Sequence, residues 1–179
     1  MSKTSVTNEN ISTEEISSPV LTFPTWRKIK LGIHKMPEDY IKALERKGFR
    51  FNRWARFFLL TKTSCAQQEI EIELVKVSGR MLGLTKSATQ REFYERANTF
   101  GLIPCVKEVG PALCEQYADQ PSETKIVIAT EPFVDDVGLL FLFCVVHDTG
   151  GRSLSIYHGR SVDILSPDDM FVFCHRRVS

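Results

Sequence analysis

Residues 138–146 read GLLFLFCVV, a run in which every position after the first glycine is apolar. A strand with alternating polar and apolar residues covers only one face of a sheet, whereas a continuous apolar run is typical of a strand buried on both faces. We therefore expect a sheet with this segment near its centre, and we expect both faces of the segment to be covered.

Neighbouring segments also have strand patterns. Residues 69–77 read EIEIELVKV, which places isoleucine and leucine on one face and glutamate on the other, as in a half-exposed strand. Residues 125–130, 153–158 and 170–175 are further short apolar runs between turn sequences. The turn sequence Asp148-Thr149-Gly150-Gly151 predicts a hairpin directly after the central run.

Start and stop signals predict a pair of helices in the first third of the chain. Pro37, followed by two acidic residues, is a favourable helix start, and Gly48 is a favourable end. Asn52 is a typical N-cap for a second helix, which begins directly after it. We expect the inner face of that second helix to consist of Trp54, Ala55, Phe58 and Leu59.

Two more helices are predicted in the middle of the chain. Thr89 and Glu92 have the spacing of a capping box, in which each side chain bonds the other residue's backbone N–H. Pro111 indicates the start of a short helix that runs to about Tyr117. Together these elements predict an α+β domain over residues 20–179, with a mixed or mostly antiparallel sheet and helices packed mainly on one face.

Residues 1–19 have a different composition from the rest of the chain. They are rich in serine, threonine, asparagine and glutamate and contain few apolar side chains. Such a segment buries too little apolar surface to offset the entropy lost on ordering. We expect it to be a disordered polar tail.

The composition and the cysteine pattern exclude several classes of protein. Hydrophobic residues make up 42% of the chain, which is enough for a core and excludes a fully disordered chain. No apolar run reaches the roughly 18 residues of a membrane helix. The five cysteines lack C-x-x-C spacing, which argues against a zinc knuckle or a thioredoxin motif. Their odd number, without a signal sequence, indicates free thiols and a cytoplasmic location. They are Cys65, Cys105, Cys114, Cys144 and Cys174.

Charge is distributed unevenly along a chain whose formal net charge is only +1. Residues 25–62 contain eleven lysines or arginines and three acidic residues, interleaved with aromatic side chains. Arg50, Arg53, Trp54 and Arg56 are therefore candidates for binding nucleic acid or an acidic partner, since bases stack on aromatic rings and phosphates attract cations. The alternative is that these cations pair with the acidic remainder of the chain.

No established catalytic motif is present, and we expect no cofactor and no metal site. The chain lacks G-x-S-x-G, G-x-x-x-x-G-K, G-x-G-x-x-G and H-E-x-x-H. His147 and His158 flank the predicted hairpin, but with Gly150 and Gly151 as its central residues they lie about 13 Å apart, at about 3.3 Å per residue. A three-residue loop would put them on opposite faces. Neither register lets them share a metal ion.

The segment 108–120 is the strongest candidate for a polar site. A glycine-proline corner follows Glu108, and Tyr117 and Gln120 come after the short helix that this corner predicts. With His158 and Arg160, these residues are the candidate catalytic side chains if the protein is an enzyme. The alternative is an ordinary helix start with a solvated face.

Four segments of the chain resemble a family of uncharacterised bacterial proteins. The resemblance would span about residues 24–177, and it implies a bacterial source and a single domain but no activity, cofactor or catalytic residue. It adds some weight to residues 108–121 as a site. The segments are TWRKIKLG at 25–32, DYIKAL at 39–44, EVGP at 108–111 with QYADQP at 116–121, and DDMFVF at 168–173.

Three function classes remain open from the sequence. The first is a small intracellular interaction or regulatory module without catalytic activity, favoured by the absence of motifs and by the uneven charge. The second is a small enzyme of unfamiliar type with a site around 108–120. The third is a nucleic-acid-binding protein that uses residues 26–58. A protein partner is expected for the first class and nucleic acid for the third; the oligomeric state is open.

Overall fold

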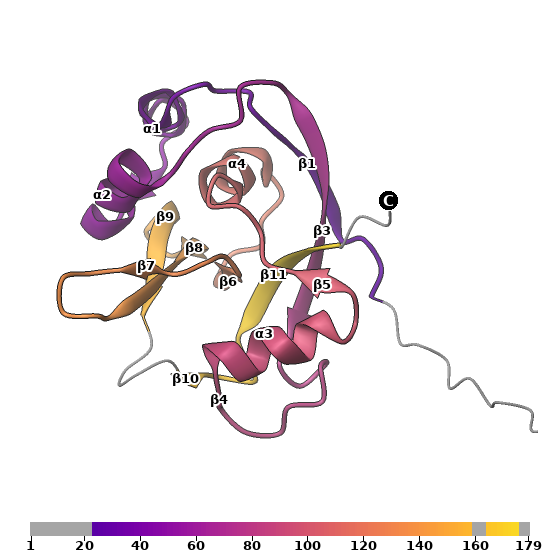
Figure 1. Ribbon diagram of the computed structural model, residues 1–179. Coiled ribbons are helices and arrows are strands. Elements are labelled where there is room, and N and C mark those ends of the chain that lie inside the picture. Colours follow the sequence, from indigo (N-terminus) through magenta and orange to yellow (C-terminus); the bar gives the residue numbers. More distant parts are fainter. Residues whose placement is uncertain (1–22, 159–163, 176–179) are drawn as a thin grey trace, which may run out of the picture.

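A mixed sheet forms the centre of the molecule in the computed structural model, which describes residues 23–158 and 164–175 (Figure 1). The polar segment 1–19 and Arg160 therefore lie outside the described residues. Within them the strands β11 and β6 are parallel, as are β2 and β9, and the other neighbours are antiparallel. The spatial order of the seven-strand path is β1 (Arg27–Leu31), β3 (Ile70–Ser78), β11 (Met170–His175), β6 (Thr124–Ile128), β8 (Leu140–Asp148), β9 (Gly151–His158) and β2 (Arg50–Phe51).

Four short strands lie off this path. Each is two residues long, and none was predicted, because two residues show no periodicity. They are β5 (Leu102–Ile103), which pairs with β11; β7 (Phe133–Val134), which pairs with β8; and β4 (Ala88–Thr89) with β10 (Ile164–Leu165), which pair with each other.

Three of the four described helices cover one face of the sheet, and one covers the other (Figure 1). This arrangement confirms the predicted α+β fold with helices mainly on one face. The three are α1 (Pro37–Arg46), α2 (Arg53–Lys62) and α4 (Val109–Gln116); the fourth is α3 (Gln90–Asn98).

The strand β8 confirms the prediction made from the central apolar run. Phe141, Phe143 and Val145 join the core cluster under α1, α2 and α4, whereas Leu142 and Cys144 join the cluster under α3. Alternate side chains of one strand point to opposite faces, so β8 contributes to both cores.

The helix ends follow the predicted capping chemistry, with one difference in register. Asn52 accepts hydrogen bonds from the backbone N–H groups of Trp54 and Ala55, and Thr89 forms the expected capping box with Glu92. The helix α4, however, begins at Val109 rather than at Pro111. A proline is tolerated throughout the first turn because N–H groups there have no partner within the helix.

The predicted hairpin is present in a register different from both that were considered, and one expectation for α2 was wrong. The central residues of the β8–β9 hairpin are Thr149 and Gly150, because Asp148 pairs with Gly151 and its carboxylate accepts the Gly150 N–H at 2.8 Å. This shifts the register, so that His147 pairs with Arg152. Trp54 does not belong wholly to the inner face of α2, since 40% of its surface is exposed.

Candidate functional site

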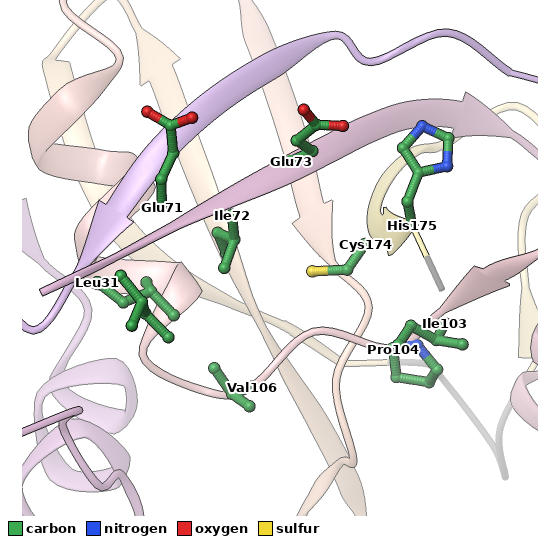
Figure 2. A pocket seen from close by; sticks show the side chains of 10 residues that line it. Leu31, Glu71, Ile72, Glu73, Ile103, Pro104, Val106, Cys174 and His175 are labelled. Carbon is green, nitrogen blue, oxygen red and sulfur yellow. The ribbon is translucent and has the colours of Figure 1, made fainter. Parts of the chain in front are cut away.

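An apolar groove of about 710 Å³ opens where β11 ends beside β3 (Figure 2). The last described pair between these strands joins Cys174 to Leu74, and β3 continues beyond it towards Ile70. The loop after β5 crosses the same region and supplies the opposite wall. The lining residues are Leu31, Ile70, Glu71, Ile72, Glu73, Ile103, Pro104, Val106, Cys174 and His175.

The side chains that point into the groove are apolar, and the carboxylates point away from it. Figure 2 shows Ile72 and Cys174 on one side of the sheet and Glu71 and Glu73 on the other. On that other side Lys28 bridges both glutamates, at 3.5 Å and 2.9 Å. Hydrogen bonds from Lys28 and Thr25 keep the pKa of the Glu73 carboxyl below its usual value. The interior of the groove is therefore lined mainly by apolar side chains, with charged groups at its border.

A second hollow of about 580 Å³ continues from this groove and is more polar. The two share Leu31, Ile70 and Val106, and Ile70 and Val106 are exposed. The second hollow is also lined by Lys62, Ser64, Cys65, Ala66, Cys105, Lys107, Glu108 and Glu131.

The Glu108 carboxylate, which the sequence singled out, holds three segments of the chain together. One carboxylate oxygen, Oε1, accepts the Gly32 N–H at 2.7 Å and the Tyr40 hydroxyl at 2.8 Å. The other, Oε2, accepts the Ala66 N–H at 2.7 Å. Burial, together with the hydrogen bond to Glu108, raises the pKa of Tyr40 well above its usual value. With only 1% of its surface exposed, Glu108 makes structural contacts here.

Tyr117 and Gln120 do not share a site with Glu108. The helix α4, which is about 12 Å long at about 1.5 Å per residue, lies between Glu108 and the other two residues. The Tyr117 ring packs edge-on against Trp26, at 5.1 Å between centroids. Gln120 donates to the Val145 carbonyl at 3.3 Å, and its Oε1 has no hydrogen-bond partner among the described atoms.

The remaining catalytic candidates are His158 and Arg160. His158 is the last residue of β9 and pairs with Phe141, and Arg160 lies outside the described residues. The other polar side chains of α4 are held by neighbouring elements. Glu115 bonds His34 at 2.9 Å and Lys47 at 2.8 Å.

Gln116 makes a paired contact with the outermost described strand. Its side-chain oxygen accepts the Lys30 N–H at 2.9 Å, and its amide nitrogen donates to the Lys30 carbonyl at 2.8 Å. The side chain of Gln116 therefore satisfies both the backbone N–H and the backbone carbonyl of Lys30 in β1.

The predicted basic residues lie at the surface, and two of the three arginines pair with acids. Arg50 contacts Asp148 in the hairpin turn at 2.6 Å, and Arg56 contacts Glu45 of α1. Elsewhere in the basic segment, Arg27 pairs with Asp119 at 2.8 Å. Arg50 and Arg27 thus pair with the acidic remainder of the chain, whereas the partner of Arg56 lies within the basic segment itself.

An exposed aromatic face of α2 differs from the rest of the basic segment. Trp54, Phe57 and Leu60 follow at intervals of three residues, with exposed fractions of 40%, 47% and 39%. The Arg53 guanidinium lies over the Trp54 ring, 5.3 Å from its centroid. We call Arg53, Trp54, Phe57 and Leu60 the α2 surface. Phe57 and Leu60 were not predicted to be exposed, although the run FFLL at 57–60 exceeds what one helix face can bury.

Inner residues of α2 anchor this surface to the sheet. Phe58 stacks on Phe133 of β7, with ring centroids 4.6 Å apart. The Trp54 ring is stacked on Phe141 of β8, with ring centroids 6.4 Å apart. One face of the ring is therefore packed, while part of its surface is exposed. The exposed side chains are therefore carried on a rigid support.

Comparison with known proteins gives no relative: no family model, no curated protein and no solved structure matches the chain. Among the described residues, no group of three or more histidine, cysteine, aspartate or glutamate side chains could hold a metal ion. None of the described helices is long and apolar enough to cross a membrane.

Proposed function

We propose that the protein is an interaction module without catalytic activity, and that its α2 surface binds an acidic, amphipathic segment of a partner protein. The observation that carries this proposal is the exposure of Trp54, Phe57 and Leu60 on one face of a helix. Exposed apolar side chains gathered in one place are characteristic of interaction sites, whereas single ones are ordinary. Aromatic residues and arginine are also the residue types enriched in protein interfaces.

Charge supports an acidic partner. The α2 sequence RWARFFLLTK contains no acidic residue. Within the described residues, neither Arg53 nor Lys62 forms an ion pair, in contrast to Arg50 and Arg56. A partner segment with apolar side chains in its centre and carboxylates at its border would complement both features.

The distribution of polar side chains supports binding rather than catalysis. A catalytic site needs several groups that converge on one reacting atom. Glu108 already accepts three hydrogen bonds from its own chain, and Tyr117 and Gln120 lie at the far end of α4. None of the three is left free to act together with the others.

A selection from a displayed random-peptide library, followed by affinity measurement, tests the proposal. We expect selected peptides to be apolar and acidic, and we expect Trp54→Ala to weaken their binding about 30-fold, as for an interface residue worth about 2 kcal/mol. Met81→Ala is the matched control, because Met81 is similarly exposed, at 46%, and lies outside the α2 surface.

Two results would contradict the proposal. Selected peptides that bind the Trp54→Ala variant as tightly as the parent would place the binding site elsewhere. A failure to select peptides, combined with salt-sensitive binding of single-stranded DNA or RNA that Arg53→Ala weakens, would favour nucleic acid as the partner. The stacking of Arg53 over Trp54 is the observation that keeps this second function open.

A further inference from the structure

Two cysteines that are distant in sequence contact each other in the wall of the groove. The Sγ atoms of Cys105 and Cys174 lie 3.1 Å apart, and the two cysteines are not joined by a disulfide bond. The pairing of β5 with β11 brings them together, because Ile103 lies opposite Cys174. Cys105 is held from its other side by a backbone hydrogen bond to Ala129 at 2.7 Å.

The two thiols differ in access to solvent. Cys174 is half-buried, and Figure 2 shows its side chain turned towards the groove that it lines. Cys105 is buried, with 5% of its surface exposed. Burial raises the pKa of the Cys105 thiol well above its usual value, and the contact with Cys174 raises it further. Cys105 is thus the inner member of the pair, and Cys174 is the more accessible one.

We propose that Cys105 and Cys174 form a reversible oxidation site that reacts with low-molecular-weight disulfides entering the groove. Cys174 is the attacking thiol because it borders a cavity large enough to admit such a molecule. Cys105 is the resolving thiol because it is in contact with Cys174 and is the more buried of the two. This site is separate from the α2 surface and does not depend on the function proposed for it.

The reaction is an ordinary two-step thiol–disulfide exchange. Cys174 loses its proton to water and attacks one sulfur of the reagent, the reagent's sulfur–sulfur bond breaks, and one thiolate leaves and is protonated. Cys105 then attacks Cys174 Sγ in the mixed disulfide, the sulfur–sulfur bond between Cys174 and the reagent breaks, and the departing thiolate takes up the proton of Cys105 and leaves as the second thiol. The two cysteines are oxidised by two electrons in total, and the reagent is reduced to two thiols.

A disulfide bond between Cys105 and Cys174 would hold the loop after β5, which forms one wall of the groove, in a fixed position. Cys105 lies between Pro104 and Val106, which both line the groove, whereas Cys174 belongs to β11. The bond would tie the loop after β5 covalently to the sheet. Hydrogen exchange in residues 102–106 should therefore be slower in the oxidised protein than in the reduced protein.

Equilibration of the full chain with oxidised and reduced glutathione tests the proposal. After alkylation of the remaining thiols, peptide mapping should recover a Cys105–Cys174 linked peptide that disappears on treatment with a strong reductant. Cys105→Ser should instead retain one glutathione on Cys174, since the resolving thiol is missing. The matched control is Cys144→Ser, because Cys144 is buried in the other core and its loss should leave the bridge unchanged.

Specific results would overturn the proposal. It fails if Cys105 and Cys174 are both recovered alkylated while Cys65 carries glutathione, or if the linked peptide forms only in denaturant. Circular dichroism checks that each variant is folded, and Cys105→Ala replaces the serine variant if the hydroxyl is not tolerated in the core. Cys174→Ser provides a second, independent test, because glutathione on Cys105 in that folded variant would contradict the assigned order of attack.

Discussion

Replacing Glu108 by glutamine should lower the free energy of unfolding by about 2 kcal/mol, because one buried donor then loses its acceptor. The carboxylate offers two oxygens to three donors, and glutamine of the same shape offers one oxygen. If that oxygen keeps its hydrogen bonds from the Gly32 N–H and the Tyr40 hydroxyl, the new NH₂ group faces the Ala66 N–H. Two hydrogen-bond donors then oppose each other. An unsatisfied buried group costs about 1–3 kcal/mol.

Urea unfolding followed by circular dichroism measures this loss by linear extrapolation. For a chain of this size the same change should lower the melting temperature by about 4–8 °C. Tyr40→Phe is the control: it removes one donor and leaves the carboxylate with two, and we expect a loss of about 1 kcal/mol.

A Glu108→Gln variant as stable as the parent would refute this reasoning. It would mean that water from the adjacent hollow forms a hydrogen bond with the Ala66 N–H. Alternatively, it would mean that the carboxylate does not hold the segments of Gly32, Tyr40 and Ala66 together. The double variant Glu108→Gln/Tyr40→Phe separates the explanations, because two residues that share a hydrogen bond should not have additive effects.

Two further predictions concern packing and thiol reactivity. A Cβ at Gly110 would lie 2.6 Å from the Phe143 ring, so Gly110→Ala should cost about 1–3 kcal/mol in thermal unfolding. Gly48→Ala, which meets no atom within 4 Å but has a φ of +78°, should cost about 1–2 kcal/mol from backbone strain alone, and its melting temperature provides the comparison. Burial, with the nearby Glu108 carboxylate as the second cause, raises the pKa of Cys65 to about 11. Its alkylation by iodoacetamide should therefore keep accelerating up to about pH 11, and a plateau near pH 9 would contradict this.

Local features of the fold were predictable because their causes are local. The apolar run in β8, the Asn52 cap and the Thr89 capping box depend on residues a few positions apart, and each is found as expected. The strand order was not predictable. The last strand, β11, lies between β3 and β6, and this depends on pairings between residues that are distant in sequence, such as Phe171 with Val77 and Met170 with Ile126.

The candidate sites show the same division between local and long-range causes. Glu108 stood out in the sequence as an acid beside a rigid corner, but its three donors come from segments that only the tertiary fold brings near. The groove could not be predicted, because Ile72, Pro104 and Cys174 become neighbours only through the pairing of β3, β11 and β5. Whether the Trp54 side chain is buried or exposed depends on which face of α2 packs against the sheet, and that is a property of the tertiary fold.

The contact between Gln116 and Lys30 has a consequence for how these molecules behave at high concentration. The strand β1 is the first in the described sheet, and the open edge of such a strand is a template on which another chain can add. A glutamine side chain has the same amide group as a peptide bond, and here it occupies the hydrogen-bonding positions that an incoming strand would need. Gln116 therefore covers the open edge of β1 at Lys30, and it protects that position from an incoming strand without lengthening the sheet.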